Sequence, residues 1–199
     1  MKVSKEVYSP AEDSYLLEEC ILKENLSGKK CLDIGTGSGV QGIAMLKCGA
    51  KELVSVDINA VALKQSKKNI LGYIKNSTKE RTQFPGHVGS VIKFKKSNLF
   101  SSLKKDKFDF IAFNPPYVPS DEIKWVDLDG GEYGRETIDK FLSSFPAHLN
   151  KNGVLLLLVS SLNKPSEIKK KLIELGFGVK VVGRRKLFFE ELLVLRVKL

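Results

Sequence analysis

The sequence predicts an α/β fold: a doubly wound, Rossmann-like sheet that is mostly parallel and carries a C-terminal antiparallel hairpin strand. Two features of the sequence predict this class. Short apolar runs alternate with longer helical patterns, which parallel strands joined by right-handed crossovers require. The last two apolar runs are instead joined by a very short turn, so we expect them to pair antiparallel at one edge of the sheet.

Each predicted element has its own pattern. Short apolar runs are predicted as the parallel strands Lys30–Ile34, Leu53–Asp57, Val91–Phe94, Phe108–Phe113 and Val154–Ser160. Runs with helical spacing are predicted as the helices Val40–Cys48, Ala60–Tyr73, Arg135–Leu149 and Pro165–Leu175. The closing hairpin pairs Val179–Leu187 with Glu191–Lys198. A further helix, from about Ala11 to Asn25, precedes the sheet, and we expect it to close over a ligand.

Length and composition indicate one domain. The 199 residues suffice for a single core, with residues 1–28 as an N-terminal helical segment and residues 29–199 as the main core. The polar N-terminus lacks an apolar signal region and no run approaches a membrane span, so we expect a cytoplasmic protein without membrane contact. Cys20, Cys31 and Cys48 lack metal-ligand spacing, so we expect reduced thiols and no metal site.

The chain is strongly basic, with a formal net charge of +10 and a pI near 9.4. Much of this charge is lysine spread over predicted helices and loops. One interpretation is solvated helix faces, and the other is attraction to an RNA-rich or acidic partner. Charge alone does not choose between them.

A glycine-rich turn follows the first predicted strand. Asp33 precedes the turn, Gly35 and Gly37 lie in it, and a helix follows. Such a turn lets the backbone approach a ligand closely, near a helix N-terminus. Gly39 comes one residue too early for the dinucleotide fingerprint, which favours a ligand without a pyrophosphate and disfavours a nicotinamide dehydrogenase. Asp57 ends the second strand, where carboxylates bind ribose hydroxyls in nucleotide-binding α/β folds.

The motif Asn114-Pro115-Pro116-Tyr117 ends the fourth predicted strand. Its two prolines end the strand and remove two N–H donors. The Asn114 amide oxygen and the Pro115 carbonyl then offer two acceptors to an –NH2 group, and the Tyr117 ring can stack on the planar group that carries it. The motif therefore predicts a site for a planar amide or an amino base. A proline-rich structural turn is the alternative for the motif taken alone.

Together these motifs resemble the class I methyltransferases that use S-adenosylmethionine. Within them, the chain is most similar to the HemK-like protein-glutamine N5-methyltransferases of the eukaryotic and archaeal release-factor branch. Residues 7–14 (VYSPAEDS) are similar to that branch's Y-x-P-x-E-D-[ST] element, and residues 130–136 (GGEYGRE) to its G-G-x-x-G-R-E segment. Two features depart from the branch: Asn98 stands where many relatives carry Asp, and the segment Asn76–Gly89 is longer and more polar.

The resemblance implies S-adenosylmethionine as the cofactor, S-adenosylhomocysteine as its product, and a catalytic core over residues 29–199. It places at the reaction centre Asn114, Pro115, Pro116 and Tyr117. The residues expected to contact the cofactor are Ser14, Asp33, Gly35, Gly37, Asp57, Ile58, Asn98, Leu99 and Asn114. Helix capping is the competing interpretation of Asp13 and Ser14.

The implied reaction is methyl transfer to the side-chain amide nitrogen of the glutamine in the Gly-Gly-Gln motif of a class I translation release factor. The rival is an N6-adenine or N4-cytosine amino-methyltransferase acting on DNA or RNA, because the same cradle suits an exocyclic amine. Such an enzyme usually needs a target-recognition domain, and this chain offers only Asn76–Gly89. A scaffold subunit that binds cofactor without catalysis is disfavoured by the intact Asn-Pro-Pro-Tyr motif.

The third predicted strand, Val91–Phe94, is expected at an exposed edge of the sheet, where unpaired backbone groups invite another strand. The resemblance implies a small zinc-binding activator protein that adds a strand at this edge. The alternative is that Asn76–Gly89 folds back and covers the edge. Nucleic acid contact is allowed by the charge but is not required for the leading function.

Overall fold

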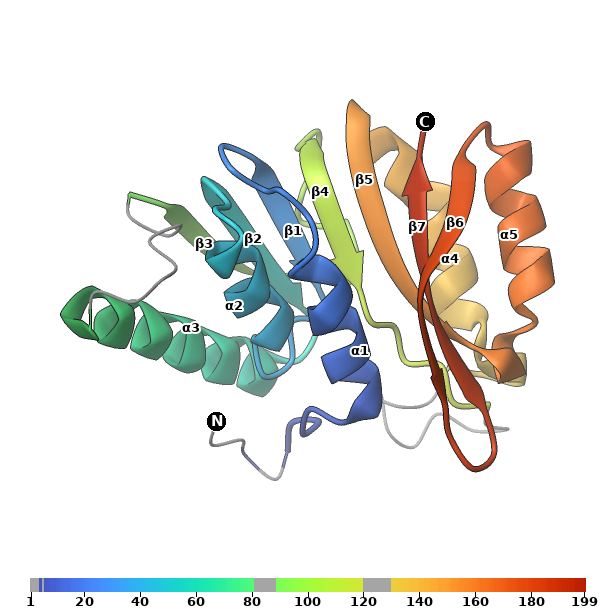
Figure 1. The fold of residues 1–199 in the computed structure, drawn as a ribbon, viewed down its shortest axis with the longest axis horizontal. Coiled ribbons are helices and arrows are strands. Elements are labelled where there is room, and N and C mark those ends of the chain that lie inside the picture. The colour runs from blue at the N-terminus through green and yellow to red at the C-terminus, as the bar shows by residue number, and fades with distance from the viewer. Residues whose placement is uncertain (1–3, 5, 81–88, 120–129) are drawn as a thin grey trace.

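The computed structural model describes residue 4 and residues 6–80, 89–119 and 130–199. A seven-stranded sheet runs through the molecule in the order β3-β2-β1-β4-β5-β7-β6 (Figure 1). The strands are β1 (Lys30–Ile34), β2 (Glu52–Asp57), β3 (Val91–Lys96), β4 (Phe108–Phe113), β5 (Leu149–Ser160), β6 (Gly178–Lys186) and β7 (Glu191–Lys198). The first five pair in parallel, whereas β7 pairs antiparallel with both β5 and β6. The predicted fold class is confirmed.

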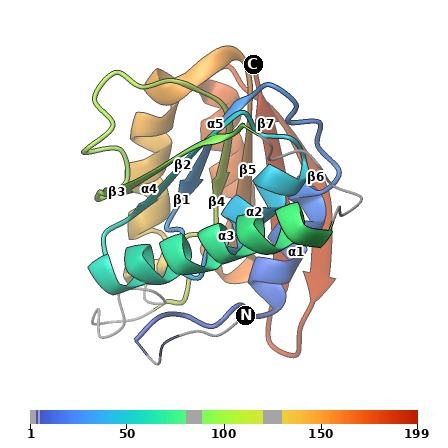
Figure 2. The same ribbon diagram turned by 90° about the vertical axis from the view of Figure 1, so that its left-hand side faces the viewer.

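Helices cover both faces of the sheet, as the two ribbon views show (Figures 1 and 2). On one face lie α1 (Glu12–Ile21), α2 (Val40–Lys47) and α3 (Ala60–Glu80), and on the other lie α4 (Glu136–Ser144) and α5 (Pro165–Glu174). Each face buries its own apolar cluster against the sheet. Burial of both faces explains why the parallel strands are apolar at nearly every position.

The structure corrects several predicted boundaries. The predicted helix Arg135–Leu149 ends at Ser144, and a 3-10 turn over Phe145–His148 leads into β5, which begins at Leu149 instead of Val154. Pro146 lacks the N–H that a continuing α-helix needs, so the helix stops before it.

The helices at the two ends of the first layer also differ from prediction. α1 ends at Ile21, short of Asn25, whereas α3 continues to Glu80, past Tyr73. The first part of the segment Asn76–Gly89 is therefore helix. Residues 81–88 lie outside the described residues, so the expectation that this segment covers the sheet edge stays a prediction.

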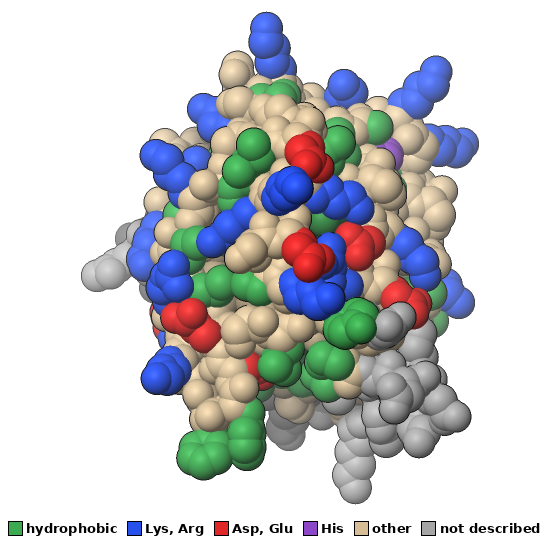
Figure 3. All heavy atoms as spheres, turned by 90° about the vertical axis from the view of Figure 1, so that its right-hand side faces the viewer, with side chains coloured by type: hydrophobic (Ala, Val, Ile, Leu, Met, Phe, Trp, Pro, Cys, Tyr) green, Lys and Arg blue, Asp and Glu red, His purple; other side chains and the backbone are tan. Residues whose placement is uncertain are grey.

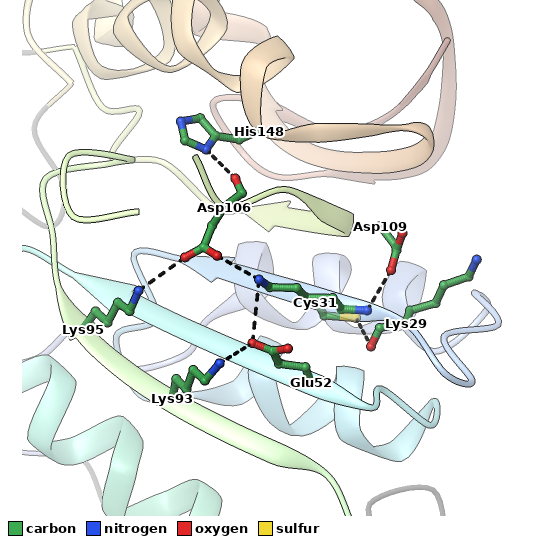
Figure 4. Close-up of polar contacts among 9 residues, drawn as sticks. Lys29, Cys31, Glu52, Lys93, Lys95, Asp106, Asp109 and His148 are labelled. Atoms are coloured by element: carbon green, nitrogen blue, oxygen red, sulfur yellow. Dashed lines mark hydrogen bonds and ion pairs between the residues drawn. The ribbon is translucent and has the colours of Figure 1, made fainter. Parts of the chain in front are cut away.

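β3 forms one edge of the sheet and pairs only with β2 among the described strands, as expected. An ion-pair network lies across this part of the sheet (Figure 4). Lys30 Nζ lies 2.9 Å from Asp106 Oδ1, and Lys93 Nζ lies 2.8 Å from Glu52 Oε1. Lys95 Nζ also contacts Asp106, at 3.3 Å. These pairs are partly exposed, so each stabilises the edge by at most about 1 kcal/mol.

The three cysteines are free thiols; Cys20 and Cys31 are buried and Cys48 is half-buried. Across residue 4 and residues 6–80, 89–119 and 130–199, His, Cys, Asp and Glu form no group of three that could hold a metal ion. Within the same residues, every helix is too short or too polar to cross a membrane.

Candidate active site

A cavity of about 330 Å³ opens at the carboxyl ends of β1, β2, β3 and β4. Ligands of open α/β sheets bind at this end of the strands. The predicted site residues that line the cavity are Ser14, Gly35, Gly37, Asp57, Ile58, Asn98, Leu99, Asn114, Pro115, Pro116 and Tyr117. Residues as far apart in the sequence as Ser14 and Tyr117 therefore line the same cavity.

The glycine-rich turn and Asp57 are bonded to each other. Gly37 N–H donates to Asp57 Oδ2 at 2.9 Å, and Asn59 N–H donates to Asp57 Oδ1 at 2.8 Å. A side chain on Gly39 would put Cβ 2.9 Å from the Ser66 hydroxyl, and Gly39 has φ +86°, so only glycine fits where α2 begins. The carboxylate is held rigidly on the cavity wall, and carboxylate oxygens accept more than one hydrogen bond.

Asp33 lies beneath the turn, away from the cavity wall. Its carboxylate is almost fully buried and accepts a 2.6 Å hydrogen bond from Thr36 Oγ1, and Thr36 lines the cavity. Burial, together with the nearby Asp57 charge, raises the pKa of Asp33 to about 7. Asp33 therefore holds the turn through Thr36, and its carboxylate does not line the cavity.

The Asn114 side chain is oriented by a residue of α1. Asn114 Nδ2 donates to Asp13 Oδ2 at 3.0 Å, and the other Asp13 oxygen accepts from Tyr8 Oη at 3.0 Å. The Asn114 Oδ1 atom is buried and has no hydrogen-bond partner among the described residues. A buried acceptor without a partner costs free energy unless a ligand supplies the donor.

The capping interpretation holds in part for Asp13. The N-cap residue of α1 is Ala11, which makes no side-chain capping bond, but the Asp13 carboxylate accepts the Ser14 N–H at 2.5 Å in the first turn. Asp13 lies inside the first turn, and the Ser14 carbonyl accepts from Gln41 Nε2 at 3.0 Å, which fastens α1 to α2. Sequence reasoning missed Asp13 as an orienting residue, although its place in the 7–14 element was the available signal.

Tyr117 is fixed through its backbone by Asn163. The buried Asn163 Nδ2 donates to the Tyr117 carbonyl at 2.7 Å and also contacts the Tyr133 carbonyl at 3.2 Å. Burial, and secondarily the Asp13 charge, raises the pKa of the Tyr117 phenol well above its usual range. Tyr117 is therefore a neutral ring at physiological pH and is unsuited to act as a general base.

The cavity fits a nucleoside-containing ligand with an amino-acid end. The backbone of the turn lines the cavity, as do the fixed Asp57 carboxylate at the end of β2 and the apolar side chains of Ile58 and Leu99. A sheet of this order with this arrangement of groups defines a class I methyltransferase that uses S-adenosylmethionine.

Comparison with known proteins identifies the family. Residues 7–188 match the family model "Methyltransferase small domain". The chain is 40% identical to the "Putative protein N5-glutamine methyltransferase" of Methanocaldococcus jannaschii, over 98% of this chain and 93% of that protein. It is 31% identical to "Methyltransferase HEMK2" of Mus musculus, over 96% of this chain and 89% of that protein.

A solved structure agrees with these relatives. The E. cuniculi Mtq2-Trm112 complex, described as responsible for methylation of the eRF1 translation termination factor, contains a chain that is 30% identical with a TM-score of 0.72. The match covers 97% of this chain and 98% of that one. The protein belongs to the methyltransferase small domain family and, within it, to the HemK-like protein N5-glutamine methyltransferases.

Proposed function

We propose that this enzyme transfers a methyl group from S-adenosylmethionine to the side-chain amide nitrogen of the glutamine in the Gly-Gly-Gln motif of a class I translation release factor. One observation carries the proposal. Asn114 stands on the cavity wall with its Nδ2 held by Asp13 and its buried Oδ1 without a partner among the described residues. An amide –NH2 group is the donor that this acceptor fits.

The residues around the turn hold the cofactor. Asp57 accepts hydrogen bonds from the ribose hydroxyls, and Gly35 and Gly37 line the methionine end. Ile58 packs on the adenine, while Asn98 and Leu99 meet its edge from the loop after β3. The support is that all six residues line one cavity and that Asp57 is held in place by the turn itself.

Ser14 lies on the same wall and approaches the methionine end from α1. Asp33 was expected near the methionine end, directly or through water. We assign it the indirect role, because it supports the turn from below through Thr36. Bound S-adenosylmethionine supplies an electrophilic methyl group on its sulfonium.

The protein's task at the acceptor is positioning. An amide nitrogen is a weak nucleophile, and the neutral Tyr117 offers no base to it. Asn114 Oδ1 and the Pro115 carbonyl each accept one N–H of the target amide, which fixes the direction of its nitrogen. Both acceptors present negative dipole ends where positive charge develops during attack. The Tyr117 ring covers the amide and excludes water.

The relatives support the choice of acceptor. The M. jannaschii protein is named for glutamine N5-methylation, and the E. cuniculi complex is described by its action on eRF1. The rival acceptors, adenine and cytosine amino groups in DNA or RNA, present the same –NH2 chemistry. No feature of the cavity favours them over an amide.

Transfer of tritium-labelled methyl groups tests the proposal. Purified class I release factor, DNA and ribosomal RNA are each incubated with enzyme and labelled cofactor. We expect label in the release factor alone. Label in DNA or RNA with an unlabelled release factor would establish the rival function.

A small zinc-binding activator protein is the partner that we propose for the β3 edge. Val91 N–H, at the start of β3, donates to the carbonyl of Lys51 just before β2, and Ser97 N–H, just after β3, donates to the Asp57 carbonyl at the end of β2. Because bonding direction alternates along a parallel strand, the N–H groups of Ile92, Phe94 and Lys96 point away from the sheet. A partner strand can pair with this row. The E. cuniculi relative, Mtq2, was solved in complex with a second protein, Trm112.

Co-expression with the candidate activator tests this edge. A 1:1 complex is expected, and Ile92→Pro should weaken it because it removes one outward N–H. Lys180→Pro, on the opposite edge strand β6, serves as the matched control and should leave the complex intact. An enzyme that is fully active alone and indifferent to the activator would reject the partner.

A further inference from the structure

The turn between β6 and β7 carries two adjacent phenylalanines that pack against little of the protein. Phe188 and Phe189 are 92% and 86% exposed, and their rings contact each other edge to face with centroids 4.6 Å apart. The turn is closed by a 2.8 Å bond from Leu187 N–H to the Glu190 carbonyl. Turns of this length favour Gly, Asn and Asp, so the fold itself gives no reason for two phenylalanines.

The turn lies at the same end of the sheet as the cavity. In Figure 1 it is the lowest point of the β6–β7 hairpin, at the end where β4 leads into the site, and Figure 3 shows hydrophobic side chains projecting at the lower end of the β6 face. Glu190, the residue after the phenylalanines, accepts a hydrogen bond from the Ser160 hydroxyl. Ser160 N–H in turn donates to Asn163 Oδ1 at 2.9 Å.

That chain of contacts ends at the reaction centre, because Asn163 holds the Tyr117 carbonyl. The Glu190 charge also contributes to the raised pKa values of Tyr8 and Tyr117, as expected for a group near the cavity. The phenylalanine pair is therefore tied, through the side chains of three residues, to the Asn-Pro-Pro-Tyr turn.

Exposed apolar residues continue from the turn toward the cavity mouth. Leu162 (45% exposed) lies in the 3-10 turn whose Ser161 hydroxyl accepts from Glu191 N–H at 3.0 Å. Tyr133 (52% exposed) is bonded to the same 3-10 turn through Asn163. Val118 lines the cavity and is 39% exposed. A set of exposed apolar residues that adjoins a reaction site marks an interaction surface.

We propose that Phe188 and Phe189 form a docking surface that seats the protein substrate beside the cavity mouth. The inference rests on the proposed function, since it concerns the polypeptide that carries the methyl-accepting glutamine. Val118 belongs both to the cavity lining and to the row of exposed apolar residues Leu162, Tyr133 and Val118, so a polypeptide whose glutamine side chain enters the cavity can run along this row to the two phenylalanines. The aromatic pair offers apolar contact area from side chains with few rotatable bonds, as aromatic interface anchors do.

Steady-state kinetics with purified release factor tests the docking surface. The double variant Phe188→Ser/Phe189→Ser is compared with wild type and with Ile173→Ser, a control that changes an exposed apolar residue near the C-terminal end of α5. We expect the double variant to raise KM for the release factor about tenfold or more, as loss of a hot spot does. Its kcat, its calorimetric affinity for S-adenosylmethionine and its melting temperature should match wild type, and Ile173→Ser should match throughout.

Any other outcome contradicts a specific claim. A double variant whose KM for the release factor equals that of wild type overturns the docking surface, while the proposed function stands. A wild type that leaves the release factor unmethylated overturns the proposed function and the dock with it. A wild type that sediments as a dimer and becomes monomeric in the double variant would assign the phenylalanines to self-association and overturn the dock.

Discussion

Asn114 Nδ2 and Asp13 Oδ2 lie 3.0 Å apart although 101 positions separate the two residues in the chain. The contact joins the end of β4 to the first turn of α1. It commits the amide nitrogen of Asn114 to Asp13 and leaves the amide oxygen without a partner among the described residues, as its proposed role toward the acceptor requires. If Asn114 positions the acceptor as proposed, α1 belongs to the reaction centre through Asp13.

Asn114→Ala should slow methyl transfer on the order of a hundredfold while cofactor affinity changes little. The substitution removes a preorganised acceptor that acts on the target amide. Single-turnover kinetics at saturating cofactor measures the rate, and calorimetry measures the affinity. A near-normal rate would show that the Asn-Pro-Pro-Tyr turn is structural only.

Asp13→Ala should lower the rate by about tenfold or more, because the Asn114 amide loses the charged hydrogen bond that orients it. Glu12→Ala, at the exposed neighbouring position, is the matched control and should behave like wild type. The same single-turnover assay applies. Equal rates for the two variants would remove Asp13 from the account.

Asp57→Ala should weaken S-adenosylmethionine binding while the fold persists. Hydrogen bonds to a charged group contribute roughly 1.5–3 kcal/mol each, which corresponds to about a tenfold to hundredfold loss of affinity. Calorimetric titration of the variant measures the loss, with the exposed Glu174→Ala as control. An affinity within about threefold of wild type would place the ribose elsewhere.

Asp33 should make stability depend on pH. Burial holds its pKa at about 7 in the folded protein, above the ordinary value of 3.8. Between these two values the folded chain binds a proton that the unfolded chain has released, so the free energy of unfolding falls as pH rises from about 4 to about 7. Asp33→Asn should flatten this part of the profile and raise the melting temperature at pH 7.5 relative to wild type. Thermal unfolding of both proteins across this range measures it, and parallel profiles would contradict the assignment.

Much of the fold could be predicted from the sequence because its strands are buried on both faces. The runs Lys30–Ile34 and Phe108–Phe113 have the bounds that the structure gives them, since an apolar run ends where a buried strand ends. The start of β5 could not be predicted in this way. Its first residues, Asn150 to Asn152, are polar and partly or fully exposed, so they have the composition of a loop.

The site was less predictable than the fold. Gly37 follows β1 and Asp57 ends β2, and the parallel pairing of these two strands brings the residues together. The partner of Asn114 lies in a helix far away in the chain, and no spacing indicates which side chain will meet it. Asp33 shows a second limit of prediction from sequence. A carboxylate at the end of a strand can point into the cavity or beneath the turn, and the sequence does not indicate which. In the structure the Asp33 carboxylate points beneath the turn, where it accepts the Thr36 hydrogen bond.

The most direct test of the account is to locate the added methyl group. Release factor is treated with wild-type enzyme and with Asn114→Ala under single-turnover conditions, digested, and sequenced by tandem mass spectrometry. The account predicts one methyl group, on the side-chain nitrogen of the glutamine in the Gly-Gly-Gln motif, with wild type and a trace of it with the variant. A methyl group on any other residue, or equal modification by both enzymes, would contradict it.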